Sequence, residues 1–171
     1  DFSLGIEPRF NEAGDVAPEK LALIEEGKLA STIVSNRSAK QYGVPTNAAP
    51  ESEDLRSPAF GAGKLAEKDA LKALGTGVYI SNFHYLNWSD VETARITGMT
   101  RFSCFWVENG ELVAPIGNMR FDESLYDLYG SKLEDLTVER SLIPETGSYV
   151  LRSLGGALLP GILAKGLRFT L

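Results

Sequence analysis

Residues 107–112 read Val-Glu-Asn-Gly-Glu-Leu, and this stretch carries the clearest information on the fold. Asn-Gly between apolar residues is the strongest short signal of a β-hairpin, because both central residues of the tight turn need a positive φ. A similar pattern, Ile-Glu-Glu-Gly-Lys-Leu, stands at residues 24–29. We therefore predict hairpins at residues 21–34 and 102–114. They indicate an internal duplication or two paired ribbons of one β-rich body, and coincidence between two ordinary hairpins is the alternative.

The segments between the two hairpins predict short helices, a loop and a strand. Residues 35–43 predict a helical turn that ends at its final glycine. Residues 45–58 are rich in Pro, Asn, Ser and acidic residues and predict a surface loop. Residues 65–74 space apolar side chains as a helix does, with a glycine directly after them, and residues 77–83 contain good strand formers.

The last third of the chain predicts one more helix and weaker strands. Asp122 is a plausible N-cap for a helix over residues 122–128. Strands are predicted near residues 149–151 and 167–171, and residues 154–164 form either an exposed apolar patch or a buried segment. Together these elements predict an α+β fold that is β-rich, with a mostly antiparallel sheet or a barrel-like body and a few short helices.

The composition is that of a soluble protein with a hydrophobic core. Of its 171 residues, 43% are hydrophobic and 23% are charged, and the length fits one ordinary domain or two small ones. The net charge of -6 disfavours direct nucleic-acid binding, which needs clustered Lys and Arg. The apolar runs are too short to cross a membrane, and a single Cys fits a reducing compartment. We therefore expect a cytoplasmic protein that binds neither membrane nor nucleic acid directly.

One segment combines small hydroxyl residues, a glycine and an arginine. Residues 97–101 read Thr-Gly-Met-Thr-Arg, in which the glycine would admit another backbone and the Arg101 guanidinium fork could hold a peptide carboxylate. His84 lies within an aromatic-rich patch at a strand end, residues 82–88, and is a candidate for substrate contact or for a pH-sensitive role. We select Thr97, Thr100, Arg101 and His84 as candidate substrate-binding residues. The alternatives are a β-bulge with a surface cation and a packed histidine.

The chain carries no recognisable catalytic or metal-binding cluster. A metal site needs several converging His, Cys or carboxylate ligands, and the sequence has one His and one Cys. Cys104 would need a neighbouring base to act as a nucleophile, and a buried core cysteine is the alternative. We predict no catalytic residue, no metal ligand and no cofactor in this chain.

Several blocks of sequence stand in an order that resembles a known family. They are residues 23–29, 37–43, 77–80, 97–101, 106–115 and 118–121. In this order they resemble the C-terminal domain of the TldD/PmbA family, the modulators of DNA gyrase. The resemblance extends over residues 10–135 and is weaker from there to the end of the chain.

The resemblance implies that residues 1–171 are the single last domain of a larger, three-domain protein. TldD-type members are metallopeptidases with a His-Glu-x-x-x-His helix in an earlier domain and a Cys ligand late in the last one. Here the only histidine is His84, and residues 153–165, where the late thiol would fall, contain no Cys. The chain therefore resembles the PmbA type more closely. Zinc is expected only in TldD-type relatives, and this chain is not expected to be active alone.

The resemblance and the residues together support two hypotheses about function. In the first, the chain forms one wall of a peptide cleft and a subunit interface, while the chemistry belongs to groups outside it. Its partners would be a peptide or protein substrate and a TldD-type subunit, and we expect a dimer. In the second, the chain is a non-catalytic scaffold that binds another protein.

Overall fold

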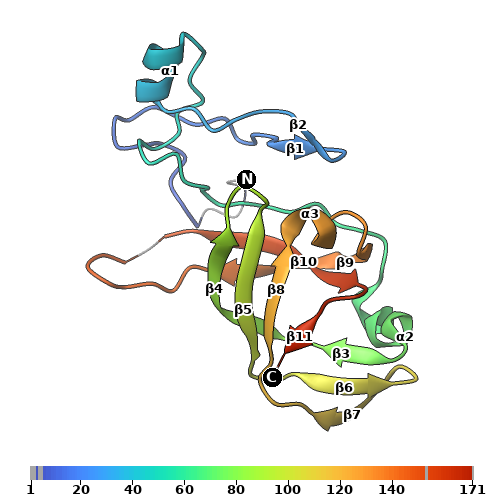
Figure 1. Cartoon of the computed structure of the whole chain (residues 1–171). Coiled ribbons are helices and arrows are strands. Elements are labelled where there is room, and N and C mark those ends of the chain that lie inside the picture. Colours follow the sequence, from blue (N-terminus) through green and yellow to red (C-terminus); the bar gives the residue numbers. More distant parts are fainter. Residues whose placement is uncertain (1–2, 4–5, 153, 171) are drawn as a thin grey trace. The chain divides into compact units, whose positions relative to one another are not determined.

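The structure is a computed structural model that describes residues 3, 6–152 and 154–170. It divides into two compact units, residues 1–60 with 141–159 (unit 1) and residues 61–140 with 160–171 (unit 2). The described residues form antiparallel sheets with a few short helices, which confirms the predicted α+β, β-rich class (Figure 1). The described strands form open sheets and no closed barrel. No described helix has the length and apolar character needed to cross a membrane.

The first predicted hairpin exists in unit 1 but is short. Strands β1 (Ile24–Glu25) and β2 (Lys28–Leu29) pair antiparallel around Glu26 and Gly27, whose φ angles are 49° and 75°. Ile24 and Leu29 are 71% and 74% exposed, so the ribbon has no apolar surface to pack against. The predicted extension of this hairpin over residues 21–34 is therefore wrong, since isolated two-stranded ribbons gain little from further pairing.

Helix α1 (Asn36–Tyr42) lies where the sequence predicts a helical turn. Ser35 caps its N-terminus, because the Ser35 hydroxyl accepts a hydrogen bond from the Ser38 backbone N–H at 3.2 Å. Gly43 ends the helix in the left-handed region with φ 68°. Residues 45–58 contain no helix or strand, as predicted, and Glu53 reaches back to accept the Ser35 backbone N–H at 2.8 Å.

The Glu53 carboxylate makes the anchoring of α1 dependent on pH. Hydrogen bonds from the Ser35 backbone, then from the Ser38 and Ser35 side chains, lower the pKa of Glu53 to about 2. Because the folded pKa lies below the unfolded one, the stabilisation is complete above pH about 4.5 and is lost as the pH falls toward about 2. We expect Glu53→Gln to speed amide hydrogen exchange in α1 at pH 7, with the difference from wild type closing in acid. Exposed Glu51→Gln is the control, and a difference that persists at pH about 2 would contradict the assignment.

Strands β9 (Leu133–Pro144) and β10 (Gly156–Ala164) pair with each other, and the boundary between the units crosses both strands. In unit 1, the Leu158 backbone binds Pro58 and Phe60, at 2.9 Å each. Residues 149–151 form bends in the connection between β9 and β10, so the predicted strand there is wrong. The segment 154–164 is mostly half-buried and fits neither of its two predicted roles fully.

The second predicted hairpin belongs to a three-stranded sheet in unit 2. Strands β3 (Gly77–Tyr79), β6 (Phe105–Glu108) and β7 (Glu111–Pro115) stand in that order. The turn residues Asn109 and Gly110 have φ angles of 51° and 82°, as the Asn-Gly signal requires. The Gly110 N–H also donates to the Gly75 carbonyl oxygen at 2.7 Å, which ties the hairpin to the end of the preceding helix.

That helix is shorter than predicted. A 3-10 turn (Glu67–Asp69) leads into α2 (Ala70–Leu74), which ends at Gly75. Leu65 was predicted to be helical, but it forms a parallel bridge with Thr137 of β9. Its backbone N–H and carbonyl are therefore bonded outside any helix, and the helix begins only after this bridge.

A four-stranded antiparallel sheet holds the predicted site residues of unit 2. Its strands stand in the order β11 (Phe169–Thr170), β8 (Arg120–Ser124), β5 (Arg95–Arg101) and β4 (Asn82–Asp90). The strand predicted over residues 77–83 is divided between β3 and β4, which belong to different sheets. The closing strand predicted at 167–171 is confirmed over Phe169–Thr170, and Leu171 lies outside the described residues.

Asp122 lies inside strand β8, so its predicted role as a helix N-cap is wrong. Helix α3 (Leu125–Leu128) begins later, with Ser124 before it. The reason is visible in the burial of β8, where Phe121 and Glu123 are 4% and 5% exposed while Arg120 and Asp122 face solvent. This alternation has the period of a strand.

Candidate functional site

The four predicted site residues lie on the ribbon formed by β4 and β5. His84 stands opposite Met99, and Phe83 stands opposite Thr100. Because opposite side chains share a face and successive ones alternate, His84, Thr97, Met99 and Arg101 lie on one face, which we call the outer face. Thr100 points to the other face. The structure thus brings together three of the four predicted residues.

Thr100 and Gly98 belong to the interior of unit 2. Thr100 is fully buried, and its hydroxyl accepts a hydrogen bond from the Met119 backbone N–H at 2.9 Å. A Cβ added at Gly98 would lie 2.9 Å from a Leu86 methyl and 3.0 Å from the Phe121 ring. The sequence predicts that another backbone approaches Gly98 closely. In the structure the side chains of Leu86 and Phe121 occupy this space instead. Both residues position the ribbon on the core.

The outer face continues from β5 onto β8. Met99 stands opposite Arg120, and Thr97 stands opposite Asp122. Arg120 therefore lies on the outer face beside Met99, on the side opposite to His84. It was not selected from the sequence. No local signal in the sequence selects it: Arg120–Ser124 contains one apolar residue, and its alternation of exposed and buried positions from Arg120 to Glu123 is seen only in the structure.

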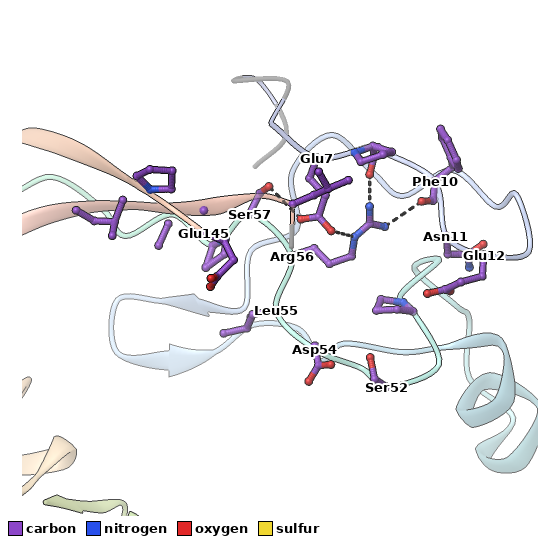
Figure 2. A pocket seen from close by; sticks show the side chains of 18 residues that line it. Glu7, Phe10, Asn11, Glu12, Ser52, Asp54, Leu55, Arg56, Ser57 and Glu145 are labelled. Atoms are coloured by element: carbon purple, nitrogen blue, oxygen red, sulfur yellow. Dashed lines mark hydrogen bonds and ion pairs between the residues drawn. The ribbon is translucent and has the colours of Figure 1, made fainter. Parts of the chain in front are cut away.

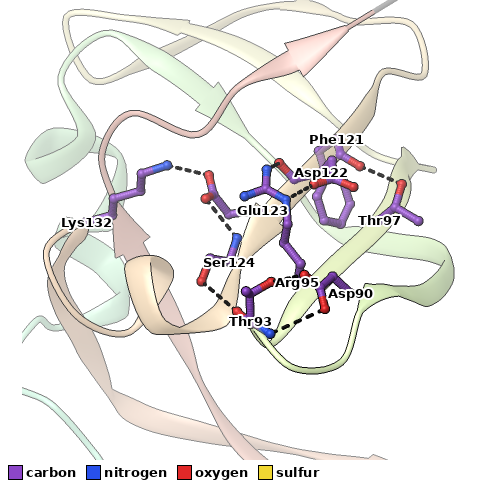
Figure 3. A network of polar contacts seen from close by, with 9 residues as sticks. All are labelled: Asp90, Thr93, Arg95, Thr97, Phe121, Asp122, Glu123, Ser124 and Lys132. Carbon is purple, nitrogen blue, oxygen red and sulfur yellow. Dashed lines mark hydrogen bonds and ion pairs between the residues drawn. The ribbon is translucent and has the colours of Figure 1, made fainter.

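A network of polar contacts occupies the end of this sheet near the β4–β5 turn (Figure 3). The Arg95 guanidinium forms an ion pair with Asp122, and the Thr93 hydroxyl donates to Asp90 at 2.7 Å. A hydrogen bond from Ser89 and then Arg95 lower the pKa of Asp122. The Thr93 hydroxyl is the main cause that lowers the pKa of Asp90. Both carboxylates are thus ionised at neutral pH and engaged in holding the turn.

The remaining cations of the outer face have no acidic partner among the described residues. Arg101 and Arg120 take part in none of the ion pairs that these residues form. The Arg101 guanidinium lies 5.4 Å from the centre of the Phe102 ring, a cation–π contact that leaves its N–H groups available to other acceptors. Since Asp122 is occupied by Arg95, the outer face carries positive charge around Met99.

Strand β4 forms an edge of the same sheet. It is the terminal strand in the sheet order, and no described strand pairs with its outer side. Tyr85 and Trp88 on this strand are 74% and 52% exposed. Tyr85 has a φ of 51° and lies where the register with β5 shifts, and the register shifts again between Trp88 and Asp90, so irregularities interrupt this edge at two places.

Unit 1 contains a separate cavity of about 710 Å³ (Figure 2). Arg56 crosses it, donating to Glu7 at 2.6 Å and to the backbone oxygens of Pro8 and Phe10. The wall also carries three further carboxylates and several apolar residues: Glu12, Asp54, Glu145, Leu55, Ile143 and Leu154. Because Arg56 is held by Glu7, the charge of this cavity disfavours anions.

The described residues do not fit a zinc centre. None of their His, Cys, Asp and Glu side chains form a group of three or more that could hold a metal ion. The His84 ring lies 4.3 Å from that of Tyr85, and Cys104 is 3% exposed with its thiol donating to the Arg101 carbonyl at 3.4 Å. Cys104 is therefore a buried core residue, the alternative considered for it above.

Comparison with known proteins gives both the fold and the family. The chain is similar to TldE from Thermococcus kodakarensis, with a TM-score of 0.74 and 17% identity over 95% of this chain and 36% of that one. It is also similar to a candidate modulator of a DNA gyrase from Thermotoga maritima, with a TM-score of 0.67 and 18% identity over 93% of this chain and 34% of that one. The comparison with curated protein sequences found no match.

The chain thus spans about a third of the length of these two proteins. At such low identity they show the fold alone. The family is shown by a sequence model described as the PmbA/TldA metallopeptidase C-terminal domain, which matches residues 5–171. This match covers nearly the whole chain, so the protein belongs to the PmbA/TldD family and corresponds to its C-terminal domain.

Proposed function

We propose that this chain forms one wall of a peptide cleft in a longer PmbA/TldD-type protein, with the exposed edge of β4 as the place where an extended peptide binds. The observation that carries the proposal is this unpaired edge of a nine-residue strand. Between its irregularities, this exposed edge presents backbone N–H and carbonyl groups with which another strand can pair. An extended peptide satisfies them through its own backbone, with little dependence on its sequence.

The side chains next to this edge suit the same role. Exposed Tyr85 and Trp88 offer apolar contacts for the side chains of a bound peptide. His84 and Arg101 offer polar contacts on the outer face, whereas the Thr97 hydroxyl donates to the Phe121 carbonyl oxygen at 3.0 Å and can only accept a further hydrogen bond. Thr100 acts in this proposal by holding the ribbon through its buried hydrogen bond to Met119.

The proposal assigns peptide-bond chemistry to groups outside this chain. Metallopeptidase activity in the longer protein would need ligands that the described residues do not bring together. We propose a PmbA-type member that works beside a TldD-type subunit in the cytoplasm. The single cysteine, buried and unpaired, is compatible with a reducing compartment.

A second candidate function, a non-catalytic protein-binding scaffold, is favoured by one observation in unit 1. Tyr149, Val150 and Leu151 are consecutive and 95%, 83% and 78% exposed. Three adjacent exposed apolar side chains are typical of a surface that another protein covers. In this alternative the partner would bind residues 149–151, and peptides would not bind β4.

Amide hydrogen exchange with a defined probe separates the two candidates. The probe is a short peptide of alternating valine and serine, blocked at both ends so that it carries no charge and offers its backbone and small side chains only. We expect it to slow exchange in β4, while residues 149–151 stay unchanged. The same peptide N-methylated at the residues that face β4 should bind at least about tenfold more weakly, because each lost backbone hydrogen bond is worth about 1 kcal/mol.

Two results would overturn the peptide-wall proposal. One is equal binding of the methylated and unmethylated peptides, which would exclude pairing along the β4 edge. The other is protection that depends on protein concentration and is confined to residues 149–151, which would support the scaffold.

A further inference from the structure

The register of the four-stranded sheet gathers three cationic or ionisable side chains around Met99. His84 and Arg120 stand directly opposite Met99, on the two strands that flank β5. Arg101 follows Met99 by two positions and so shares its face. Directly opposed Cβ atoms lie about 5 Å apart and diagonal neighbours about 7–8 Å apart, so both arginine side chains can reach one small group between them.

The charges around this cluster leave the two arginines available to a ligand. The nearest carboxylate by register is Asp122, two positions after Arg120 on the same face, and Arg95 forms an ion pair with it. The guanidinium of Arg101 is steadied over the Phe102 ring. Arg120 is exposed and takes part in none of the ion pairs formed by the described residues. The cluster is therefore positive within a chain whose net charge is -6.

We propose that Arg101 and Arg120, with His84 beside them, form a binding site for a peptide carboxylate on the outer face of this sheet. The site rests on the proposed peptide-binding role of β4, because His84 lies on that edge strand and the arginines lie on the next two strands inward. A peptide bound along the edge would place its carboxylate on the outer face by crossing over β4. The cluster would then favour peptides whose C-terminus, or whose acidic side chain, reaches the two arginines.

The chemistry of the cluster suits a carboxylate. Arginine presents two parallel N–H groups that match the two oxygens of a carboxylate. A phosphate backbone of a nucleic acid would need a longer basic stripe, and the acidic balance of the chain opposes it. Two chemical sources of the carboxylate exist, the C-terminus of the peptide and an acidic side chain within it.

The test uses a matched set of peptides on the whole chain and on two single variants, Arg101→Gln and Arg120→Gln. The set contains the blocked valine-serine peptide, the same peptide with a free C-terminal carboxylate, and blocked peptides with one internal Glu or Gln. We expect one carboxylate form to bind about tenfold more tightly than its neutral counterpart, as a charge-assisted hydrogen bond supplies. Each variant should remove that preference, and Arg120→Gln should leave the binding of the neutral peptides unchanged.

Arg152→Gln is the matched control, since Arg152 is exposed and lies in unit 1. A preference for the free C-terminus identifies a site for peptide ends, and a preference for Glu over Gln identifies an internal acidic residue. No preference in the wild type, or a preference that survives both variants, would overturn the carboxylate site. That failure would leave neutral peptide binding at β4 intact, whereas loss of all binding in the wild type would count against the proposed function itself.

Discussion

Replacing Phe121 by alanine is expected to lower the free energy of unfolding of unit 2 by about 3–5 kcal/mol. Phe121 is 4% exposed and lies at the centre of the inner face of the four-stranded sheet. Its ring centre is 4.6 Å from that of Phe83 and 6.5 Å from that of Phe169. The substitution removes both aromatic contacts and leaves a cavity under Gly98, where the Phe121 ring now fills the space.

The measurement is denaturant unfolding followed by tryptophan fluorescence. Both tryptophans of the chain, Trp88 and Trp106, lie in unit 2, so the signal reports this unit. Tyr126→Ala is the control, because Tyr126 is 71% exposed and its loss should cost less than about 1 kcal/mol. Equal losses for the two variants would show that the inner face of this sheet is not the main apolar contact of unit 2.

Replacing Gly63 by alanine is expected to destabilise unit 2 by about 3 kcal/mol, at the upper end of the range for overpacking. A Cβ at Gly63 would lie 2.1 Å from the Leu136 carbonyl oxygen and 2.6 Å from its carbon. Both are backbone atoms of β9, so no side-chain rotation relieves the clash. The Gly63 N–H donates to the Thr137 carbonyl at 3.0 Å, and separating the two segments breaks this bond as well.

Gly61→Ala, two residues earlier, is the matched control. A Cβ at Gly61 meets nothing within 4 Å, and we expect a change within about 0.5 kcal/mol. The same fluorescence measurement applies to both variants. If Gly63→Ala unfolds at the same denaturant concentration as Gly61→Ala, then the segment before α2 does not lie against β9 as described.

The candidate site could be predicted from the sequence only in part. His84, Thr97 and Arg101 were selected because of their residue types, and the structure places them on one face. Thr100 was selected with them, but the strand alternation sends it to the interior, where it is fully buried. Arg120 completes the cluster only through the pairing of β5 with β8, a contact between segments about twenty residues apart whose register no local pattern reveals.

Local sequence is sufficient to predict the elements whose causes lie within a few residues. The Asn109-Gly110 turn needs two positive φ angles, and α1 is bounded by the Ser35 cap and Gly43. The tertiary structure alone decided the rest. The first hairpin is limited to β1 and β2 because no apolar surface supports a longer one. Leu65 forms a bridge with β9 and is not helical. Asp122 lies in a strand, where it forms an ion pair with Arg95. These outcomes depend on partners distant in sequence, because the burial and register that they offer outweigh local propensity.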